Sequence, residues 1–261
     1  MACIKSYEAF AALIYVTDNE EQAVMRMFDW TQRRFDGDRQ LYYEARVQRG
    51  DTTVLVSAAR QSEMGMTAAA TLSMKLIEHY KPLYLMMPGI AAGFSKSNAE
   101  EQMYGDVVLA TSIWNYSNGK YVSPEKAEVL FGNIGFIPRP TVVEMEPELA
   151  AILRDAAGRS DCECFVDMGS MASGTAVVAN ADALMAIHSQ SFDTRGMDME
   201  AYGVAYAAGE AVEPRPYAII AKSICDFADG RKDDKYQKFA AYTSCEFIKY
   251  LITSALPEKI K

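Results

Sequence analysis

The chain has 261 residues, of which 50% are hydrophobic and 23% are charged, and its formal net charge is −9. A chain of this length and composition can bury the core of one large α/β domain, and its charged fraction excludes a disordered polymer. The negative charge argues against nucleic acid as a partner, because an acidic surface repels a phosphate backbone.

Short apolar segments alternate with longer amphipathic segments along the chain. Buried strands are predicted at 10–16, within 46–59, and at 83–87, 106–113 and 216–224. Helices are predicted at 20–33, 66–79, 150–157, 181–189, 200–210 and 236–254. A turn is predicted at Pro88-Gly89, and a long loop over 115–140, which is rich in Gly, Pro, Ser and Asn.

This alternation of strands and helices indicates the fold class. We expect a single-domain, three-layer α/β sandwich with a mixed, mostly parallel central sheet flanked by helices. Residues 1–9 are interpreted as an N-terminal extension and residues 10–261 as the domain itself.

Metal and membrane sites have no support in the sequence. The five cysteines form no Cys-x-x-Cys pair, and His79 and His188 both lie in helix-like apolar segments, so no metal site is expected. No apolar run reaches the ~18 residues that a membrane span needs, and no basic segment precedes an apolar one at the N-terminus. We therefore expect a cytoplasmic protein with no membrane partner.

Two of the segments that follow predicted strands carry weak signals on their own. Ligands of open α/β sheets bind at the carboxyl ends of the strands, so these segments matter most. VTDNEEQAV places Glu20 and Glu21 at a strand-to-helix junction, where acidic residues also simply favour the helix dipole. MPGIAAGF contributes Ala91 and Ala92, small residues that let a flat ring approach the backbone.

Two further segments place a carboxylate in an apolar setting. In MDMEAYG, Glu200 opens a helix of small and apolar residues, and its two oxygens suit a pair of sugar hydroxyls. A carboxylate facing water at a helix start is the simpler interpretation. In SICDFAD, Asp226 ends a buried strand, where partial desolvation favours the protonated form and makes it a candidate acid.

Taken together, GIAAG, SGTAVV, MDMEAYG and SICDFAD occur in an order and at spacings that resemble the nucleoside phosphorylase superfamily. Within that superfamily the chain is most similar to the methylthioadenosine and adenosylhomocysteine nucleosidases, over residues 11–256. The resemblance implies cleavage of the N-glycosidic bond of a purine nucleoside or nucleotide, without a cofactor, by a homodimer. The loop IWNYSNGKY resembles nucleosidase modules of larger signalling and defence proteins.

The resemblance also implies roles for individual residues. Asp226 protonates the leaving purine, Glu200 holds the ribose hydroxyls, and Met199 packs on the sugar. Glu20 positions the attacking water, with Glu21 as the alternative in a shifted register. The base is lined by Ala91, Ala92, Val177 and Val178, and Cys225 stands where relatives commonly carry Ser.

The same resemblance leaves the nucleophile open between water and phosphate. Hexameric purine phosphorylases carry an Arg where this chain has Met87, and the first strand-end loop is acidic, so we expect hydrolysis. A phosphate-dependent phosphorylase remains the alternative, because one of Arg33, Arg34, Arg39 and Arg60 could reach the site. Three further alternatives are a nucleotide sensor, an interaction domain of a larger protein, and a nucleosidase module of a larger signalling or defence protein that acts on AMP or ATP.

Overall fold

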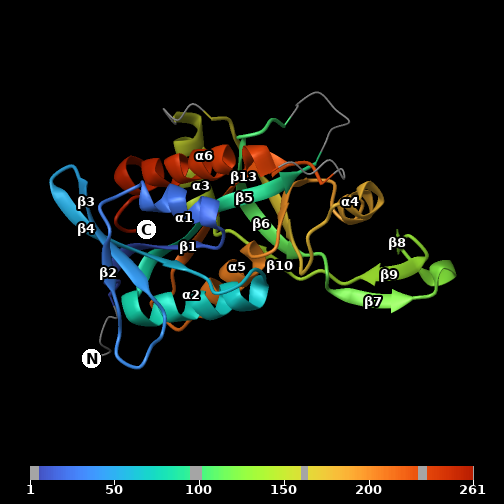
Figure 1. Ribbon diagram of the computed structural model, residues 1–261, viewed down its shortest axis with the longest axis horizontal. Coiled ribbons are helices and arrows are strands. Elements are labelled where there is room, and N and C mark those ends of the chain that lie inside the picture. Colours follow the sequence, from blue (N-terminus) through green and yellow to red (C-terminus); the bar gives the residue numbers. More distant parts are fainter. Residues whose placement is uncertain (1–5, 95–101, 160–163, 229–233, 261) are drawn as a thin grey trace.

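The computed structural model of the chain describes residues 6–94, 102–159, 164–228 and 234–260. It confirms the three-layer α/β architecture, with a central sheet between two layers of helices (Figure 1). The sheet has the strand order β10-β6-β11-β12-β5-β1-β4-β3-β2, and β13 pairs with both β5 and β6. These strands are β1 (Ala9–Tyr15), β2 (Thr31–Arg33), β3 (Tyr42–Arg49), β4 (Thr52–Arg60), β5 (Pro82–Gly93), β6 (Val107–Asn115), β10 (Val142–Glu144), β11 (Val166–Ser173), β12 (Thr194–Asp198) and β13 (Tyr217–Asp226).

The sheet is mixed. Parallel pairing joins β4, β1, β5 and β13, as well as β6, β11 and β12. Antiparallel pairing joins β12 to β5, and β13 to β6. The strands β5, β13, β6, β11 and β12 therefore close into a ring, which brings segments distant in sequence to one edge.

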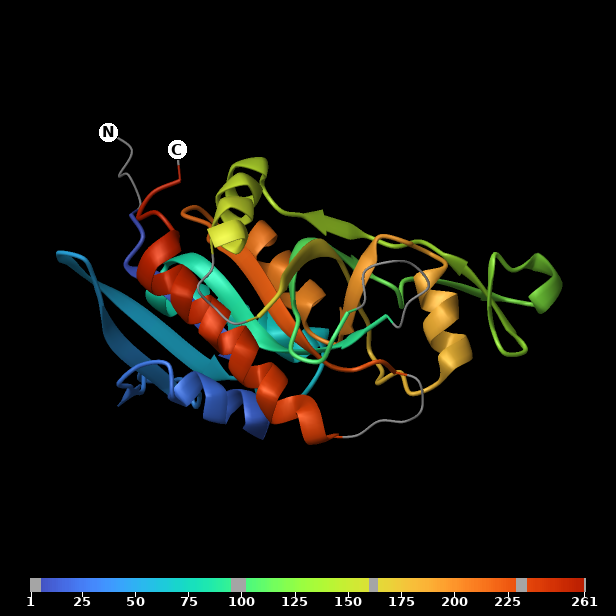
Figure 2. The same ribbon diagram turned by 90° about the horizontal axis from the view of Figure 1, so that it is seen from above.

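Helices cover both faces of the sheet. On one face α1 (Asp18–Met25), α3 (Pro147–Arg159) and α6 (Gln237–Tyr250) enclose one hydrophobic core. On the other face α2 (Met66–Tyr80) and α5 (Ala201–Glu210) enclose a second core, and this layer lies behind the sheet in the view of Figure 2. Short elements complete the structure: α4 (Ala181–His188), the 3-10 turns at 124–126 and 234–236, and a π-helical turn at 251–255. None of the helices in the described part of the chain has the length and apolar character of a membrane span.

The helix predicted at 20–33 is too long. The α1 helix ends at Met25, and the indole of Trp30 donates a hydrogen bond to the Val24 carbonyl at 2.9 Å. That carbonyl would accept from residue 28 in a continued helix. Residues 31–33 instead form strand β2, which pairs with β3. Pairing with the edge of the sheet therefore decides the structure of this segment, although its hydrophobic periodicity is that of a helix.

The turn predicted at Pro88-Gly89 is wrong, because β5 continues through it to Gly93. The neighbouring β13 pairs along this whole stretch, with Ala221 opposite Pro88 and Lys222 opposite Gly89. Pairing with a long buried strand therefore keeps a Pro-Gly dipeptide extended.

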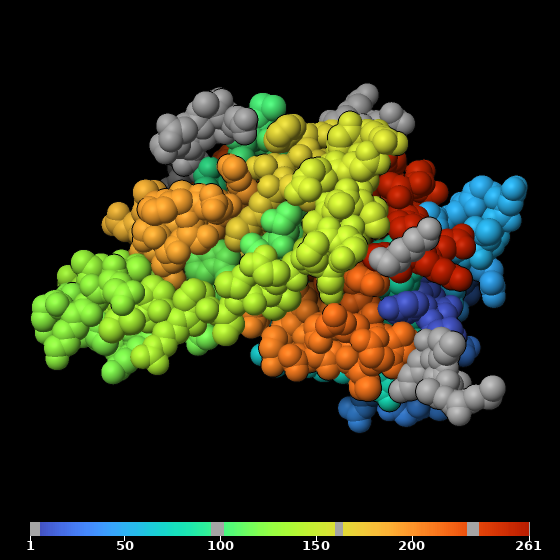
Figure 3. Space-filling model, turned by 180° about the vertical axis from the view of Figure 1, so that it is seen from behind, coloured from blue at the N-terminus to red at the C-terminus, as the bar shows by residue number. Residues whose placement is uncertain are grey.

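The loop predicted at 115–140 is also wrong in part, because it folds into an arm of three strands. These are β7 (Gly119–Val122), β8 (Val129–Phe131) and β9 (Ile134–Pro138), which form a separate antiparallel sheet. Phe136 is buried among Tyr121 and Phe131 and supplies a small apolar centre. The arm projects from the body of the molecule (Figure 3).

A glycine permits the close packing of α5 against the start of α2. A Cβ added to Gly203 would lie 2.2 Å from the Met66 carbonyl oxygen, which is fixed backbone. Gly209, in the same helix, has no heavy atom within 4 Å of such a Cβ. The two glycines thus differ in packing alone.

We expect Gly203→Ala to lower the free energy of unfolding by roughly 1–3 kcal/mol, because the α2–α5 contact must open. Gly209→Ala is the matched control and should leave stability unchanged or raise it by up to about 1 kcal/mol, since alanine favours helix. Urea denaturation of both variants measures the difference. Equal stabilities would show that the helices accommodate a methyl group without cost.

Candidate active site

An open cavity lies at the carboxyl ends of β1, β5, β12 and β13. Small residues, aliphatic residues and carboxylates from segments far apart in sequence meet there. The predicted site residues that line the cavity are Glu20, Ala91, Ala92, Val177, Val178, Met199, Glu200, Cys225 and Asp226. Glu21 is not among the lining residues, and its carboxylate pairs with Arg60 at 2.7 Å.

Glu20 is held by the backbone of two strand ends. It is the third residue of α1, which Thr17 caps, and only 2% of it is exposed. One carboxylate oxygen accepts from the amides of Val16 at 2.9 Å and Thr17 at 2.8 Å, and the other accepts from the amide of Ile90 at 3.0 Å. A carboxylate offers about four lone-pair sites, so one remains for a further donor.

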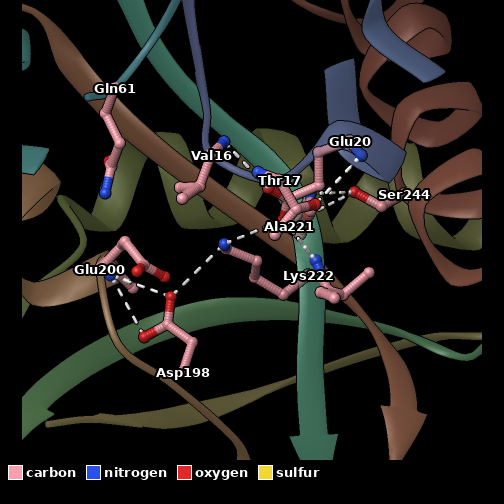
Figure 4. Close-up of polar contacts among 12 residues, drawn as sticks. Val16, Thr17, Glu20, Gln61, Asp198, Glu200, Ala221, Lys222 and Ser244 are labelled. Atoms are coloured by element: carbon pink, nitrogen blue, oxygen red, sulfur yellow. Dashed lines mark hydrogen bonds and ion pairs between the residues drawn. The ribbon is translucent and has the colours of Figure 1, made fainter. Parts of the chain in front are cut away.

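Lys222 supplies the positive charge of the site (Figure 4). Its ammonium lies 3.7 Å from Glu20 Oε1 and 3.6 Å from Asp198 Oδ2, and its side chain is 1% exposed. Burial by itself lowers the pKa of Lys222, but the carboxylates of Glu20, Asp198 and Glu200 outweigh it and raise that pKa. The lysine is therefore a charged group that joins β13 to α1 and β12.

Glycine at position 89 makes this cluster possible. Its φ is +150°, and an added Cβ would lie 2.2 Å from Glu20 Oε1 and 2.8 Å from the Lys222 ammonium. The Gly89 amide donates to the Ser244 hydroxyl at 2.7 Å. The glycine-containing segment thus admits the Glu20–Lys222 pair, while Ala91 and Ala92 face the cavity.

Two carboxylates lie at the start of α5, and they have different partners. Asp198 accepts hydrogen bonds from the Ala201 amide at 2.9 Å and from the Ser173 hydroxyl at 2.5 Å, so it satisfies the helix start. Glu200 makes no capping hydrogen bond and instead accepts from the Gly65 amide at 2.8 Å. It is 7% exposed, which contradicts the interpretation of a carboxylate facing water.

Burial raises the pKa of Glu200 to about 7, and the neighbouring Asp198 adds to this, while the Lys222 ammonium acts in the opposite direction. Three buried carboxylates with one cation give this end of the cavity an excess of negative charge. It therefore suits hydroxyl donors or a group that becomes positive.

Asp226 lies at the other end of the cavity. It is four residues beyond Lys222 in β13, so the Cα atoms of the two residues are about 13 Å apart at the usual rise of a strand. Its carboxylate accepts from the Ala228 amide at 2.9 Å and from the Cys225 thiol at 3.3 Å. It lies opposite Ala92 in the sheet, and small and aliphatic residues such as Ala91, Val177 and Val178 also line the cavity.

Asp198 and Lys222 are site residues that the motifs in the sequence do not predict. A signal for Lys222 was available, because a lysine within the apolar run YAIIAKSIC must be paired if the strand is buried. Asp198 stands two residues before Glu200, where alternation along β12 into the helix start brings both toward the same site. Its partners, Lys222 and Ser173, are distant in sequence.

The Phosphorylase superfamily model matches residues 16–256. The uncharacterized protein y4jS of Sinorhizobium fredii is 28% identical over 86% of this chain and 55% of its own length. ATP nucleosidase Cap17 of Escherichia coli is 25% identical over 77% of this chain and 42% of its own. The chain therefore spans about half the length of the curated relatives it matches. In structure, it is similar to the 5'-methylthioadenosine/S-adenosylhomocysteine nucleosidase of Neisseria meningitidis, with a TM-score of 0.73, 21% identity and coverage of 94% and 99%.

The raised pKa of Glu200 predicts a pH-dependent difference in stability between the protein and its Glu200→Gln variant. A folded-state pKa of about 7, above the ordinary 4.5, contributes stability at low pH that is lost as pH rises through this window. We expect Glu200→Gln to gain on the order of 2–3 kcal/mol relative to wild type between pH 4.5 and 8.

Urea denaturation at several pH values measures this gain. Glu210→Gln, at the exposed other end of α5, is the control and should follow the wild-type profile. Parallel profiles for Glu200→Gln and wild type would mean that Glu200 is already ionised in the folded protein near pH 5.

Proposed function

The chain belongs to the phosphorylase superfamily, and from this membership and the geometry of its cavity we propose that it hydrolyses the N-glycosidic bond of adenosine-type purine nucleosides or nucleotides. The observation that carries the proposal is the distribution of carboxylates. Glu20 and Glu200 are buried beside Lys222, and Asp226 lies farther along β13, opposite Ala92 in the sheet. A sugar fits beside the first two carboxylates and a flat base beside Asp226.

In this proposal Asp226 acts on the base. The purine lies between Ala91, Ala92, Val177 and Val178, and Asp226 delivers a proton to N7 as the C1′–N9 bond breaks. The electron pair of that bond then leaves with a neutral purine rather than with an anion, which lowers the barrier. The Cys225 thiol and the Ala228 amide keep the carboxyl group in place.

Glu20 and Glu200 act on the sugar. As C1′ becomes cationic, the surplus negative charge at this end stabilises it. Glu200 accepts from the ribose hydroxyls, and Met199 packs on the sugar. The remaining lone pair of Glu20 holds the attacking water, whose oxygen bonds to C1′ while its proton passes to Glu20. Geometry favours Glu20 over Glu21 for this task, because Glu21 is bound to Arg60 outside the cavity wall.

The lining of the cavity supports water as the nucleophile. Among the described residues that line it there is no Arg or Lys, and Met87 is buried in the core between the sheet and the α2–α5 layer. Phosphate as nucleophile needs such cations to hold its charge. The ATP nucleosidase among the relatives supports an adenine nucleotide as a substrate, and its greater length supports the alternative that the fold serves as a module of a larger protein.

The test of the function is purine release from adenosine, inosine, methylthioadenosine, AMP and ATP in phosphate-free buffer, followed by chromatography. We expect free adenine and ribose, or its 5′-derivative, without added phosphate. Strict dependence on phosphate, with ribose-1-phosphate as the product, would establish a phosphorylase instead. Tight binding of a nucleotide without any base release would establish a sensor.

The role of Asp226 is tested by Asp226→Asn, which keeps the shape of the side chain and removes its proton-donating acid. We expect kcat to fall by roughly 10²–10⁴-fold, because that is the usual contribution of a general acid. Circular dichroism and the urea midpoint should stay near wild type, which separates lost chemistry from lost folding. Near-normal kcat would remove Asp226 from the mechanism.

A further inference from the structure

A second, open cavity adjoins the first. Its walls come from the turn after β1, from residues 39–41 and from residues 60–64 after β4. Val16, Thr17 and Met64 line both cavities. The two spaces therefore adjoin at these three residues.

The shared residues lie at the sugar end of the site. Thr17 caps the helix that carries Glu20, and Met64 precedes Gly65, whose amide holds Glu200. In a nucleoside the 5′ carbon is attached at C4′, which is separated from C1′ and the base by the ring oxygen. A ribose placed on Glu20 and Glu200, with its base toward Asp226, therefore directs its 5′ substituent to the second cavity.

Two arginines, singled out in the sequence without an assigned role, line this second cavity. The Arg60 guanidinium donates to the Val16 carbonyl at 2.9 Å and pairs with Glu21 at 2.7 Å and Asp18 at 2.6 Å. The Asp18 side chain is 80% exposed, so its ion pair is weak and its carboxylate can be exchanged for another anion. A phosphoryl oxygen is such an anion, while Glu21 and Val16 keep the guanidinium in place.

Arg39 is presented by a loop whose backbone is fixed on both sides of it. The preceding Asp38 accepts from Lys75 at 2.6 Å and from Tyr42 at 2.7 Å, which ties the loop to α2 and β3. The following Gln40 donates from its amide to Asp38 at 2.9 Å and from its side chain to the Arg60 carbonyl at 3.0 Å. The Arg39 side chain itself is exposed at the cavity.

We propose that the second cavity is a 5′ subsite that binds a phosphoryl group through Arg39 and Arg60, so that the substrates are adenosine 5′-phosphates. This inference rests on the proposed function and specifies its substrate class. Asp18 and Glu63 also line the cavity, so its charges nearly balance. Recognition therefore depends on direct contacts to the two guanidinium groups rather than on a broad positive field.

The experiment compares kcat/KM for AMP with kcat/KM for adenosine in phosphate-free buffer, in wild type, Arg39→Ala and Arg34→Ala. Arg34 is the matched control, because it is exposed five residues earlier and lines neither cavity. We expect Arg39→Ala to lower the AMP-to-adenosine ratio by roughly 10–100-fold, the usual worth of a charge-assisted hydrogen bond. Arg34→Ala should leave the ratio within about twofold of wild type.

An unchanged ratio in Arg39→Ala, or an equal fall in Arg34→Ala, would overturn the subsite. Inorganic phosphate tests the other source of a phosphoryl group. If added phosphate stimulates the cleavage of adenosine by wild type, and Arg39→Ala abolishes this stimulation, then Arg39 binds phosphate as the nucleophile. If wild type releases no base at all, the proposed function fails. Calorimetric binding of AMP to wild type and Arg39→Ala then still decides whether the subsite exists, with equal affinities overturning it.

Discussion

The buried ammonium of Lys222 is the interaction on which the site depends. A lysine in a core strand is costly unless carboxylates surround it, and here Glu20 and Asp198 supply them from the ends of other strands. The pair also requires Gly89, because any side chain there would occupy the position of the charged atoms. One charge cluster thus fixes the relative positions of β1, β5, β12 and β13.

This cluster also explains the chemical asymmetry of the cavity. The Asp198 carboxylate pairs with Lys222 and accepts hydrogen bonds from Ser173 and from the backbone at the start of α5. Glu200 therefore does not need to cap this helix, and its side chain lines the cavity. Burial is the main cause of the raised pKa of Glu200, and the negative charge of Asp198 and Glu20, which the single lysine balances incompletely, adds to it. Around the base, Asp226 is accompanied by small and aliphatic residues such as Ala91, Ala92, Val177 and Val178.

The loop that carries Arg39 shows how a segment outside the central strands acquires a defined position. Asp38 lies in a nest of donors from α2, β3 and its own loop, and these hydrogen bonds, opposed by burial, hold its pKa well below the usual range. His79 stacks on Phe35 and contacts Asp38, so both histidine and lysine on α2 serve this anchor. The arm formed by β7, β8 and β9 is organised differently, around the buried Phe136.

The sequence by itself determined the fold class and most of the cavity lining. Hydrophobic periodicity is a local property, so long elements such as α2 and α6 were predicted closely. The carboxyl-end rule pointed to Glu20 and Asp226, and the apolar helix that Glu200 opens pointed to Glu200. Their catalytic roles stay predictions.

Tertiary structure alone decided the end of α1, the path of β5 through Pro88 and the strands β11 and β12, because each depends on a partner strand distant in sequence. The same holds for Lys222 and Asp198. Which buried charges belong to the site depends on the residues that pair with them, and these residues come together only when the sheet forms.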